Sequence, residues 1–192
     1  MKPALFFDVE TTGTDPARDV IVQIAAVLDD GQGRERAALN LLIRPDGWTV
    51  PAEAARLHGI TTEIAAANGV PLVVALAAFN HLCRAALVGV GHNVGFDIRF
   101  VEAAFARIGR GESCALGALD VFCTKEWATP IVNLPPTDRM VRAGYGHKPK
   151  AATLEEAIRH FFGEDLDGAH DALVDVRACR RLYHLARARG EA

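Results

Sequence analysis

The sequence predicts an α/β domain built around a mixed β-sheet. Three strand-like segments follow one another closely within residues 5–43, and helical and strand-like segments then alternate along the remainder of the chain. A chain of 192 residues lies within the usual size of one domain. We therefore expect residues 1–192 to form a single domain.

The three early strands are apolar runs separated by turn-forming residues. We expect them at residues 5–8, 20–28 and 37–43, with turns at 13–19 and 29–33 that are rich in Gly and Asp. Helical spacing of apolar residues then predicts a helix over 71–86, and the short apolar run 87–90 predicts a fourth strand.

The second half of the chain continues the alternation. A helix is expected over residues 97–108, a fifth strand over 116–122 and a last helix over 171–188. Thr153 with Glu156 three residues later forms a capping-box pattern, which predicts a helix over 153–162. The segment 130–150 is rich in Pro and Gly and is the one long candidate loop.

Composition excludes several classes of protein. Half of the residues are hydrophobic and 23% are charged, as in globular domains, and no apolar run is long enough to span a bilayer. The chain does not begin with a signal-peptide pattern, so we expect a soluble, cytoplasmic protein without membrane contact. The four cysteines form no CxxC pair, which argues against a disulfide framework or zinc ribbon. A net charge of −3 argues against nucleic-acid binding by overall charge.

An acidic pair ends the first expected strand. Because side chains alternate between the faces of a strand, Asp8 and Glu10 should project to the same side, about 7 Å apart. Many strands end in exposed acidic residues, so the pair by itself does not predict a site.

Two distant aspartates make a site more plausible. Asp97 heads the apolar stripe of its helix, although an N-cap aspartate would fit the same position and would stabilise the helix by about 1 kcal/mol. Asp175 falls on the apolar stripe of the last helix, where an unpaired carboxylate costs several kcal/mol. It therefore requires a basic side chain or a metal ion as partner.

A cation shared by Asp8, Glu10, Asp97 and Asp175 would satisfy all four acids. An all-oxygen site suits Mg²⁺ or Mn²⁺ and disfavours zinc. His170 precedes Asp175 by five residues, so it can approach the cluster only from outside the helix proper. There a histidine could accept a proton from an attacking water near neutral pH, unless it is an ordinary solvated loop residue.

Three sequence motifs resemble those of the DnaQ-like DEDDh exonucleases, in the same order along the chain. They are FDVETTG at residues 7–13, GHNVGFDIRF at 91–100 and HDALVD at 170–175. LHGIT at 57–61 resembles a further element of that family. The resemblance implies a ribonuclease H-like fold, a five-stranded mixed sheet whose second strand is antiparallel and which is flanked by helices.

The resemblance also implies roles for the five central residues. Asp8, Glu10 and Asp175 would hold one metal ion, Asp8 would bridge to a second, Asp97 would complete the site partly through water, and His170 would be the general base. The implied reaction is 3′→5′ exonucleolytic hydrolysis of terminal phosphodiesters by a two-metal mechanism, which releases nucleoside 5′-monophosphates. Residues that could border the terminal nucleotide are Thr11, Thr12, Gly13, Leu57, His58, Asn93 and Phe96, although packing or turn formation would explain each of them equally well.

Single-stranded or frayed 3′ ends are the expected substrate, with DNA favoured over RNA. The basic segment 135–150, with Arg139, Arg142, Lys148, Lys150 and Tyr145, is a plausible path for the strand, or else an ordinary solvated loop. A polymerase partner is compatible with the resemblance, but the tethering segment of proofreading subunits has no counterpart here. An exoribonuclease is the alternative within the fold, and a non-catalytic nucleic-acid-binding module is the alternative of another class. The sequence leaves the oligomeric state open.

Overall fold

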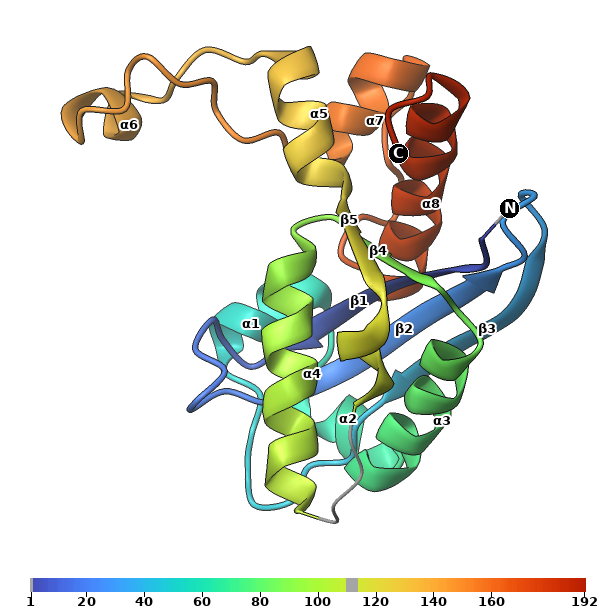
Figure 1. The fold of residues 1–192 in the computed structure, drawn as a ribbon. Coiled ribbons are helices and arrows are strands. Elements are labelled where there is room, and N and C mark those ends of the chain that lie inside the picture. The colour runs from blue at the N-terminus through green and yellow to red at the C-terminus, as the bar shows by residue number, and fades with distance from the viewer. Residues whose placement is uncertain (1, 110–113) are drawn as a thin grey trace.

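A five-stranded sheet organises the computed structural model, which describes residues 2–109 and 114–192 (Figure 1). The strand order is β3-β2-β1-β4-β5, with β2 antiparallel to both of its neighbours, and β4 and β5 parallel to β1. The strands are β1 Ala4–Thr11, β2 Ile21–Asp29, β3 Glu35–Leu42, β4 Val88–Gly91 and β5 Asp120–Cys123. The predicted five-stranded mixed sheet with an antiparallel second strand is confirmed.

β1 is the central strand, and its two neighbours differ in length. β2 pairs with β1 along the whole length of β1, and Asp8 lies opposite Ala25. β4 pairs with β1 only as far as Phe6, which lies opposite Val90. The last residues of β1 therefore extend beyond β4, and that side of the strand is open to the helix that follows β4.

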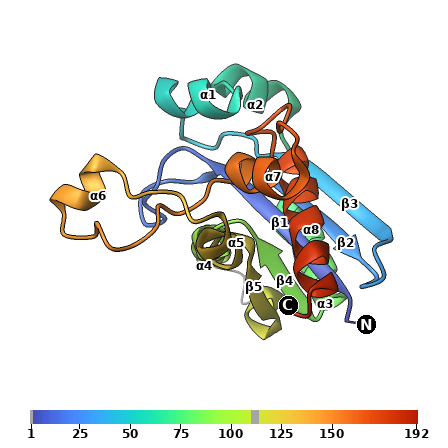
Figure 2. The same cartoon turned by 90° about the horizontal axis from the view of Figure 1, so that it is seen from above.

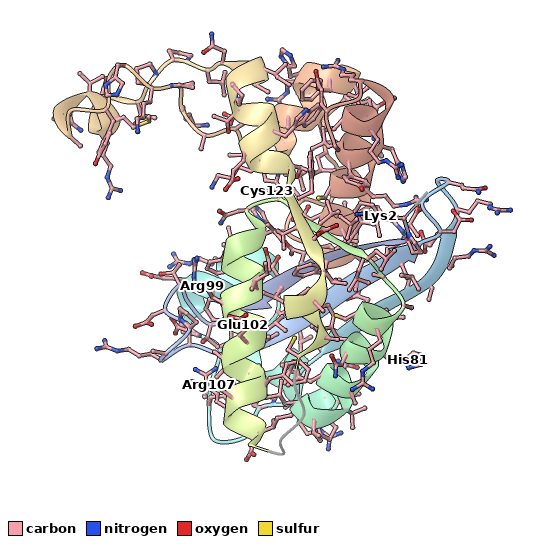
Figure 3. The ribbon with its side chains drawn as sticks, viewed as in Figure 1. Lys2, His81, Arg99, Glu102, Arg107 and Cys123 are labelled. Atoms are coloured by element: carbon pink, nitrogen blue, oxygen red, sulfur yellow. The ribbon has the colours of Figure 1, made fainter. Side chains whose placement is uncertain are left out.

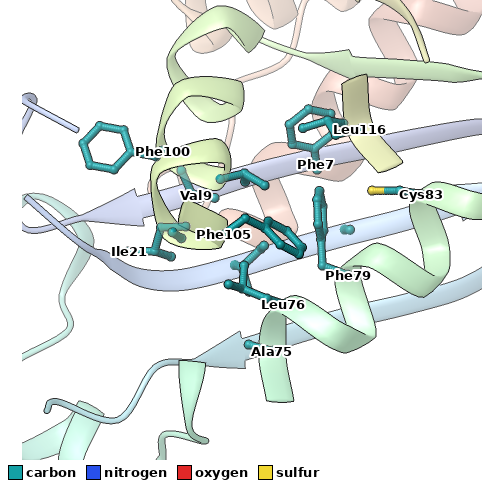
Figure 4. Packing of buried hydrophobic residues seen from close by; sticks show 14 of the residues in the cluster. Phe7, Val9, Ile21, Ala75, Leu76, Phe79, Cys83, Phe100, Phe105 and Leu116 are labelled. Carbon is teal, nitrogen blue, oxygen red and sulfur yellow. The ribbon is translucent and has the colours of Figure 1, made fainter. Parts of the chain in front are cut away.

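Helices α3 (Leu72–Arg84) and α4 (Val94–Ile108) cover one face of the sheet. Phe7 of β1 and Phe79 of α3 are fully buried there and meet edge to face, with ring centroids 5.5 Å apart (Figure 4). Phe105 of α4 lies in the same cluster. Burial of these large aromatic side chains is a major source of the packing energy of this layer.

Helices α5 (Thr124–Val132), α7 (Leu154–Phe162) and α8 (Ala172–Ala188) cover the opposite face. Phe6 packs edge to face against Tyr183 of α8, with centroids 5.4 Å apart. Because side chains alternate along β1, Asp8 and Glu10 follow Phe6 on this face. The acidic pair thus projects toward α8.

A buried carboxylate ties α8 to the turn between β2 and β3. Asp29 is fully buried, and its Oδ2 accepts hydrogen bonds from Arg180 Nε at 2.7 Å and from His184 Nε2 at 3.1 Å. Its Oδ1 accepts the backbone N–H of Gly31 at 2.6 Å. This network holds α8 against the sheet two turns beyond the candidate site.

Some local predictions are confirmed and others are wrong. The capping box of Thr153 and Glu156 is present at the start of α7. The expected strand over 116–122 is wrong in its first half, because Ala115–Ala118 forms a short 3-10 turn and pairing with β4 begins at Asp120. The candidate loop 130–150 in fact starts inside α5 and contains the short helix α6 (Asp138–Arg142).

Two short helices lie where the sequence predicted no element. They are α1 (Ala52–His58) and α2 (Thr62–Asn68), each of seven residues. None of the helices formed by the described residues combines the length and the apolar character needed to cross a membrane. A single domain over 1–192 stays a prediction, since it includes Met1 and residues 110–113, which lie outside the described part of the chain.

Candidate active site

The four predicted acids come from three elements that meet at the end of β1. Asp8 and Glu10 are half-buried on β1, Asp97 is buried on α4 and Asp175 is half-buried in the first turn of α8. They meet because the end of β1 projects past β4 into the space where α4 begins, while α8 crosses the face to which Asp8 and Glu10 point. The structure thus brings together residues from positions 8 to 175.

Asp97 is held by β1 itself. Its Oδ1 accepts the backbone N–H of Val9 at 3.1 Å, on the part of β1 that has no partner in β4. The alternative of an N-cap aspartate is wrong, because α4 starts at Val94 and Asn93 occupies the cap position. The Asp97 carboxylate lies in the first turn of α4. There it accepts the hydrogen bond that a strand paired with this part of β1 would otherwise accept.

No Lys or Arg of the described part of the chain pairs with Asp175, as a structural ion pair would require. Its Oδ2 accepts only the backbone N–H of His170, at 3.2 Å, and its Oδ1 is buried with no hydrogen-bond partner among the described residues. An orphaned carboxylate oxygen costs free energy comparable to a lost charged hydrogen bond. The interpretation of Asp175 as half of a salt bridge is therefore wrong.

His170 lies immediately before α8, as its spacing from Asp175 predicted. Asp171 caps the helix by accepting the N–H groups of Leu173 and Val174 at 2.9 and 3.2 Å. His170 is exposed and adopts φ of 68°, a left-handed conformation that few non-glycine residues adopt. This backbone turn carries its side chain back toward the acids.

Glu10, His170 and Asp175 lie close enough to share an ion. One potential ligand atom from each lies within 4.8 Å of the other two. The sequence predicted His170 as a base rather than a ligand, and this geometry brings its ring to the same place as the carboxylates. Asp8 and Asp97 interact with this group electrostatically, because the charge of Asp8 raises the pKa of both Glu10 and Asp97.

Burial disfavours the charged forms of all four acids, and repulsion from other acids of the cluster adds to the effect at Asp8, Glu10 and Asp97. Burial is the main cause, and it raises the pKa of Asp8 to about 7, of Glu10 to about 8 and of Asp175 to about 6. The charge of Asp175 adds to the shift of Asp8, and that of Asp8 to the shift of Glu10. Burial and the charge of Asp8 also raise the pKa of Asp97 well above its ordinary value.

These residues fit divalent cations. The four acids lie close enough to influence one another's pKa, and among the described residues no Lys or Arg pairs with any of them and Asp175 Oδ1 has no partner. The donors are mainly carboxylate oxygens, which Mg²⁺ and Mn²⁺ prefer. A cation would offset the repulsion and supply the missing partner.

Several of the residues proposed to border the substrate have structural partners of their own. Thr11 Oγ1 donates to Gly13 O at 2.6 Å, and Thr12 Oγ1 accepts the N–H of Val20 at 3.0 Å, so both shape the loop after β1. A Cβ at Gly13 would lie 2.4 Å from Asp19 Oδ2, which explains the glycine by close packing.

The remaining four candidates divide into exposed and packed side chains. Leu57 is 58% exposed at the end of α1, whereas Phe96 packs on Phe100 with centroids 4.8 Å apart. His58 is buried, its Nδ1 accepts the N–H of Ile60 at 3.1 Å, and its Nε2 has no partner among the described residues. Burial lowers the pKa of His58 and the charge of His170 adds to the shift, while an interaction with the backbone of Thr11 opposes it, so the neutral ring is favoured. Asn93 is exposed in a left-handed conformation at the start of α4.

A buried polar network behind the acids was not predicted. His92 Nδ1 lies 3.0 Å from Thr124 Oγ1, and His92 Nε2 lies 3.1 Å from Ala152 O. Thr124 Oγ1 also lies 3.4 Å from the thiol of Cys179, one turn beyond Asp175 on α8. Burial lowers the pKa of His92 to about 4, so the ring is neutral. The network connects the start of α4 with α5 and α8, and only the place of His92 in its motif could have signalled it.

Comparison with known proteins identifies the family of this chain. The profile of the exonuclease family RNase_T matches residues 5–183. DNA polymerase III subunit epsilon of Treponema pallidum is 27% identical over 179 residues, which cover 92% of this chain and 73% of that protein. The PolC-type DNA polymerase III of Streptococcus thermophilus is 32% identical over 180 residues, which cover 93% of this chain but 11% of that protein.

Solved structures show the same fold. E. coli Exonuclease I in complex with a dT13 oligonucleotide superimposes with a TM-score of 0.77 at 23% identity. The superposition covers 98% of this chain and 42% of that one, so the chain spans less than half of its structural neighbour. Because the family match extends over nearly the whole chain, the protein belongs to the exonuclease family RNase_T, among the DnaQ-like 3′→5′ exonucleases.

Proposed function

We propose that the protein hydrolyses the terminal phosphodiester at the 3′ end of single-stranded or frayed DNA and releases nucleoside 5′-monophosphates. The observation that carries this proposal is the convergence of Asp8, Glu10, Asp97 and Asp175, for which residues 2–109 and 114–192 supply no Lys or Arg partner and no hydrogen bond to the buried Asp175 Oδ1. Asp8, Glu10 and Asp175 would hold the first of two Mg²⁺ or Mn²⁺ ions, and Asp8 and Asp97 would hold the second. When bound, such ions supply a nucleophilic water and stabilise the leaving 3′ oxygen.

The side chains of the protein then have separate tasks. His170, outside the helix and within reach of Glu10 and Asp175, takes the proton of the attacking water. The buried His58, whose lowered pKa favours the neutral ring, offers its Nε2–H as a donor to the terminal nucleotide, and the exposed Leu57 offers an apolar surface to the base. Asn93 and Phe96 border the site at the start of α4, and Thr11, Thr12 and Gly13 shape the loop beside it.

DNA is favoured over RNA by the kinds of protein that the chain resembles. Two relatives are named as DNA polymerase III proteins, and a structural neighbour was solved with a dT13 oligonucleotide. Because these relatives are named as DNA polymerase III proteins, a DNA polymerase is a candidate partner of this protein. We expect the protein to act in the cytoplasm. An exoribonuclease activity would use the same acids, so both substrates belong in one assay.

The test is a cleavage assay on 5′-labelled single-stranded DNA and RNA of matched sequence with Mg²⁺ or Mn²⁺. Wild-type protein should release mononucleotides stepwise from the 3′ end of DNA, and EDTA should stop the reaction. Asp8→Ala should abolish release, while Glu102→Ala, which removes an exposed carboxylate from α4 (Figure 3), should not. If wild-type protein releases no mononucleotide from any 3′ end, the proposal is wrong.

A further inference from the structure

A structured arm projects from the molecule between α5 and α7. Residues 134–150 leave the body after α5 and return before α7, and an isolated antiparallel bridge between Leu134 and Lys150 closes the base of this arm. Lys150 N–H donates to Leu134 O at 3.0 Å. In both views the arm, which contains α6, stands away from the sheet on the side where β1 ends (Figures 1 and 2).

The arm has internal order although it buries none of the residues of α6. Thr137 caps α6 by accepting the N–H of Met140 at 3.3 Å. Tyr145 N–H donates to Met140 O at 2.8 Å, and Lys148 N–H donates to Tyr145 O at 3.1 Å. These bonds give the arm a defined shape, although none of its residues belongs to a buried hydrophobic cluster. Core packing therefore does not explain why the arm carries the side chains that it does.

Those side chains include the cations Arg139, Arg142, Lys148 and Lys150 and the ring of Tyr145 against one carboxylate, Asp138, in a chain whose net charge is −3. Lys150 pairs with Glu156 at the base of the arm, but Arg139, Arg142 and Lys148 form no ion pair with any described residue. Tyr145 is 52% exposed, and Lys148 Nζ lies 5.5 Å from the centroid of its ring. Figure 3 shows the side chains around α6 standing free of the rest of the protein.

α5 connects this surface with the acid cluster. Its first turn lies beside the start of α4, where Lys125 Nζ donates to Asn93 Oδ1 at 3.2 Å, and its other end leads into the arm. Nine helical residues span about 13 Å. A flexible anionic polymer whose end lies at the acids could therefore pass Lys125 and reach the arm, whereas a mononucleotide could not.

We propose that the arm binds the single-stranded nucleic acid behind the 3′ end that is being cleaved, with Arg139, Arg142 and Lys148 on its phosphates and Tyr145 stacked on a base. This inference rests on the proposed function and extends its binding surface. Unpaired cations beside an exposed aromatic ring match a single strand, which offers both phosphates and bases. An acidic protein surface would use the cations but would leave the ring without a specific role.

Binding without catalysis gives the first test. A labelled single-stranded DNA is titrated with protein in EDTA, and anisotropy reports the affinity. The triple variant R139A/R142A/K148A should bind at least tenfold more weakly than wild type. For this variant the slope of log affinity against log salt concentration should also be less steep by about 2, because each of the three lost single-strand phosphate contacts contributes about 0.7. Y145A should weaken binding without changing that slope. The single variants Arg142→Ala and Arg84→Ala form a matched pair: Arg142→Ala should weaken binding, while Arg84→Ala, which removes an exposed cation from α3, should not.

Kinetics give the second test and separate the arm from the active site. The triple variant should raise KM for a long oligonucleotide, while kcat for it and the hydrolysis of thymidine 5′-(4-nitrophenyl phosphate) stay at wild-type values. If wild-type protein cleaves neither substrate, the proposed function fails and the binding titration still decides the role of the arm. Equal affinity of the triple variant and wild type for the oligonucleotide would overturn the inference. The inference would also be overturned if wild-type protein were a dimer and the triple variant a monomer, because the arm would then be a subunit contact.

Discussion

The backbone N–H of Val9 donates to Oδ1 of Asp97 at 3.1 Å, in a place where a neighbouring strand would ordinarily accept it. β4 stops pairing with β1 at Phe6, and the first turns of α4 supply this carboxylate in its stead. The same residue therefore completes the backbone hydrogen bonding of the central strand and belongs to the acid cluster.

Asn and Ala at position 97 should separate these two contributions. Asp97→Asn keeps an oxygen that can accept from Val9, whereas Asp97→Ala leaves a buried N–H unpaired, at a cost of about 1–3 kcal/mol. Both should lower Mg²⁺-dependent exonuclease activity by about 100-fold or more, because several kcal/mol of metal-dependent stabilisation would be lost. Urea unfolding in EDTA should show D97N at least as stable as wild type and D97A less stable. Equal stability of the two variants would contradict the role of the Val9 hydrogen bond.

The metal-free protein should lose stability as pH rises from about 4 to 8. Burial, with repulsion among the acids, raises the pKa of Asp8 to about 7 and of Glu10 to about 8. Between the ordinary carboxyl range near 4 and these values, the folded state binds more protons than the unfolded state, so the free energy of unfolding falls as pH rises. Thermal unfolding in EDTA should give a lower midpoint at pH 8 than at pH 5. The double variant D8N/E10Q should narrow this difference, and an unchanged difference would show that these acids do not cause it.

Asp29→Ala should lower the stability of the fold without removing any contact of the acid cluster. It would leave the largely buried guanidinium of Arg180 unpaired, which costs about 3–5 kcal/mol in such sites. Burial alone would raise the pKa of Asp29, but hydrogen bonds from Arg180, His184 and Gly31 outweigh it and lower the pKa. The contribution of Asp29 is therefore present above pH 4 and is lost as pH falls through the lowered pKa.

Glu35→Ala is the matched control for Asp29→Ala, because Glu35 meets the more exposed Arg177 at 3.1 Å. Such a pair contributes about 0–1 kcal/mol. Denaturant unfolding at neutral pH measures both variants. A loss for Asp29→Ala no larger than that for Glu35→Ala would mean that the Asp29 network does not hold α8 in place.

His170→Asn should separate catalysis from backbone conformation. His170 has φ of 68°, and Asn tolerates the left-handed region better than other non-glycine residues do, so the variant should keep the stability of wild type. Loss of a general base should lower kcat by about 100- to 10,000-fold while Mg²⁺ still raises the unfolding midpoint. Stopped reactions at saturating DNA measure kcat. A kcat within a few-fold of wild type would place the base elsewhere.

Residue chemistry and periodicity predicted the sheet and brought the right acids into consideration. The alternation of side chains along β1 put Asp8 and Glu10 on one face, and the helical register put Asp175 on the buried side of α8. The position of His170 outside α8 also followed from its spacing, and the Asp171 cap confirms where the helix begins. The catalytic roles of these residues stay predictions, since geometry brings the side chains together without testing what they do.

Other features depend on contacts that no local pattern contains. Asp29 was interpreted as a turn residue, yet its burial depends on Arg180, 151 positions later in the chain. The bond from Val9 to Asp97 depends on where β4 stops, and Asp97 was for that reason open to interpretation as an N-cap. Helices α1 and α2, at seven residues each, are too short for periodicity to distinguish them from loops.

The central place of β1 in the sheet also determines how readily its amides exchange with solvent. A strand with paired neighbours on both sides opens only when much of the fold opens, so the Leu5 and Phe6 amides should be among the slowest to exchange deuterium. The arm, closed at its base by one isolated bridge, should exchange orders of magnitude faster. Asp8 and Glu10 thus directly continue the strand segment that should persist longest, while the cations of the arm lie on a part that can adjust to the shape of its ligand.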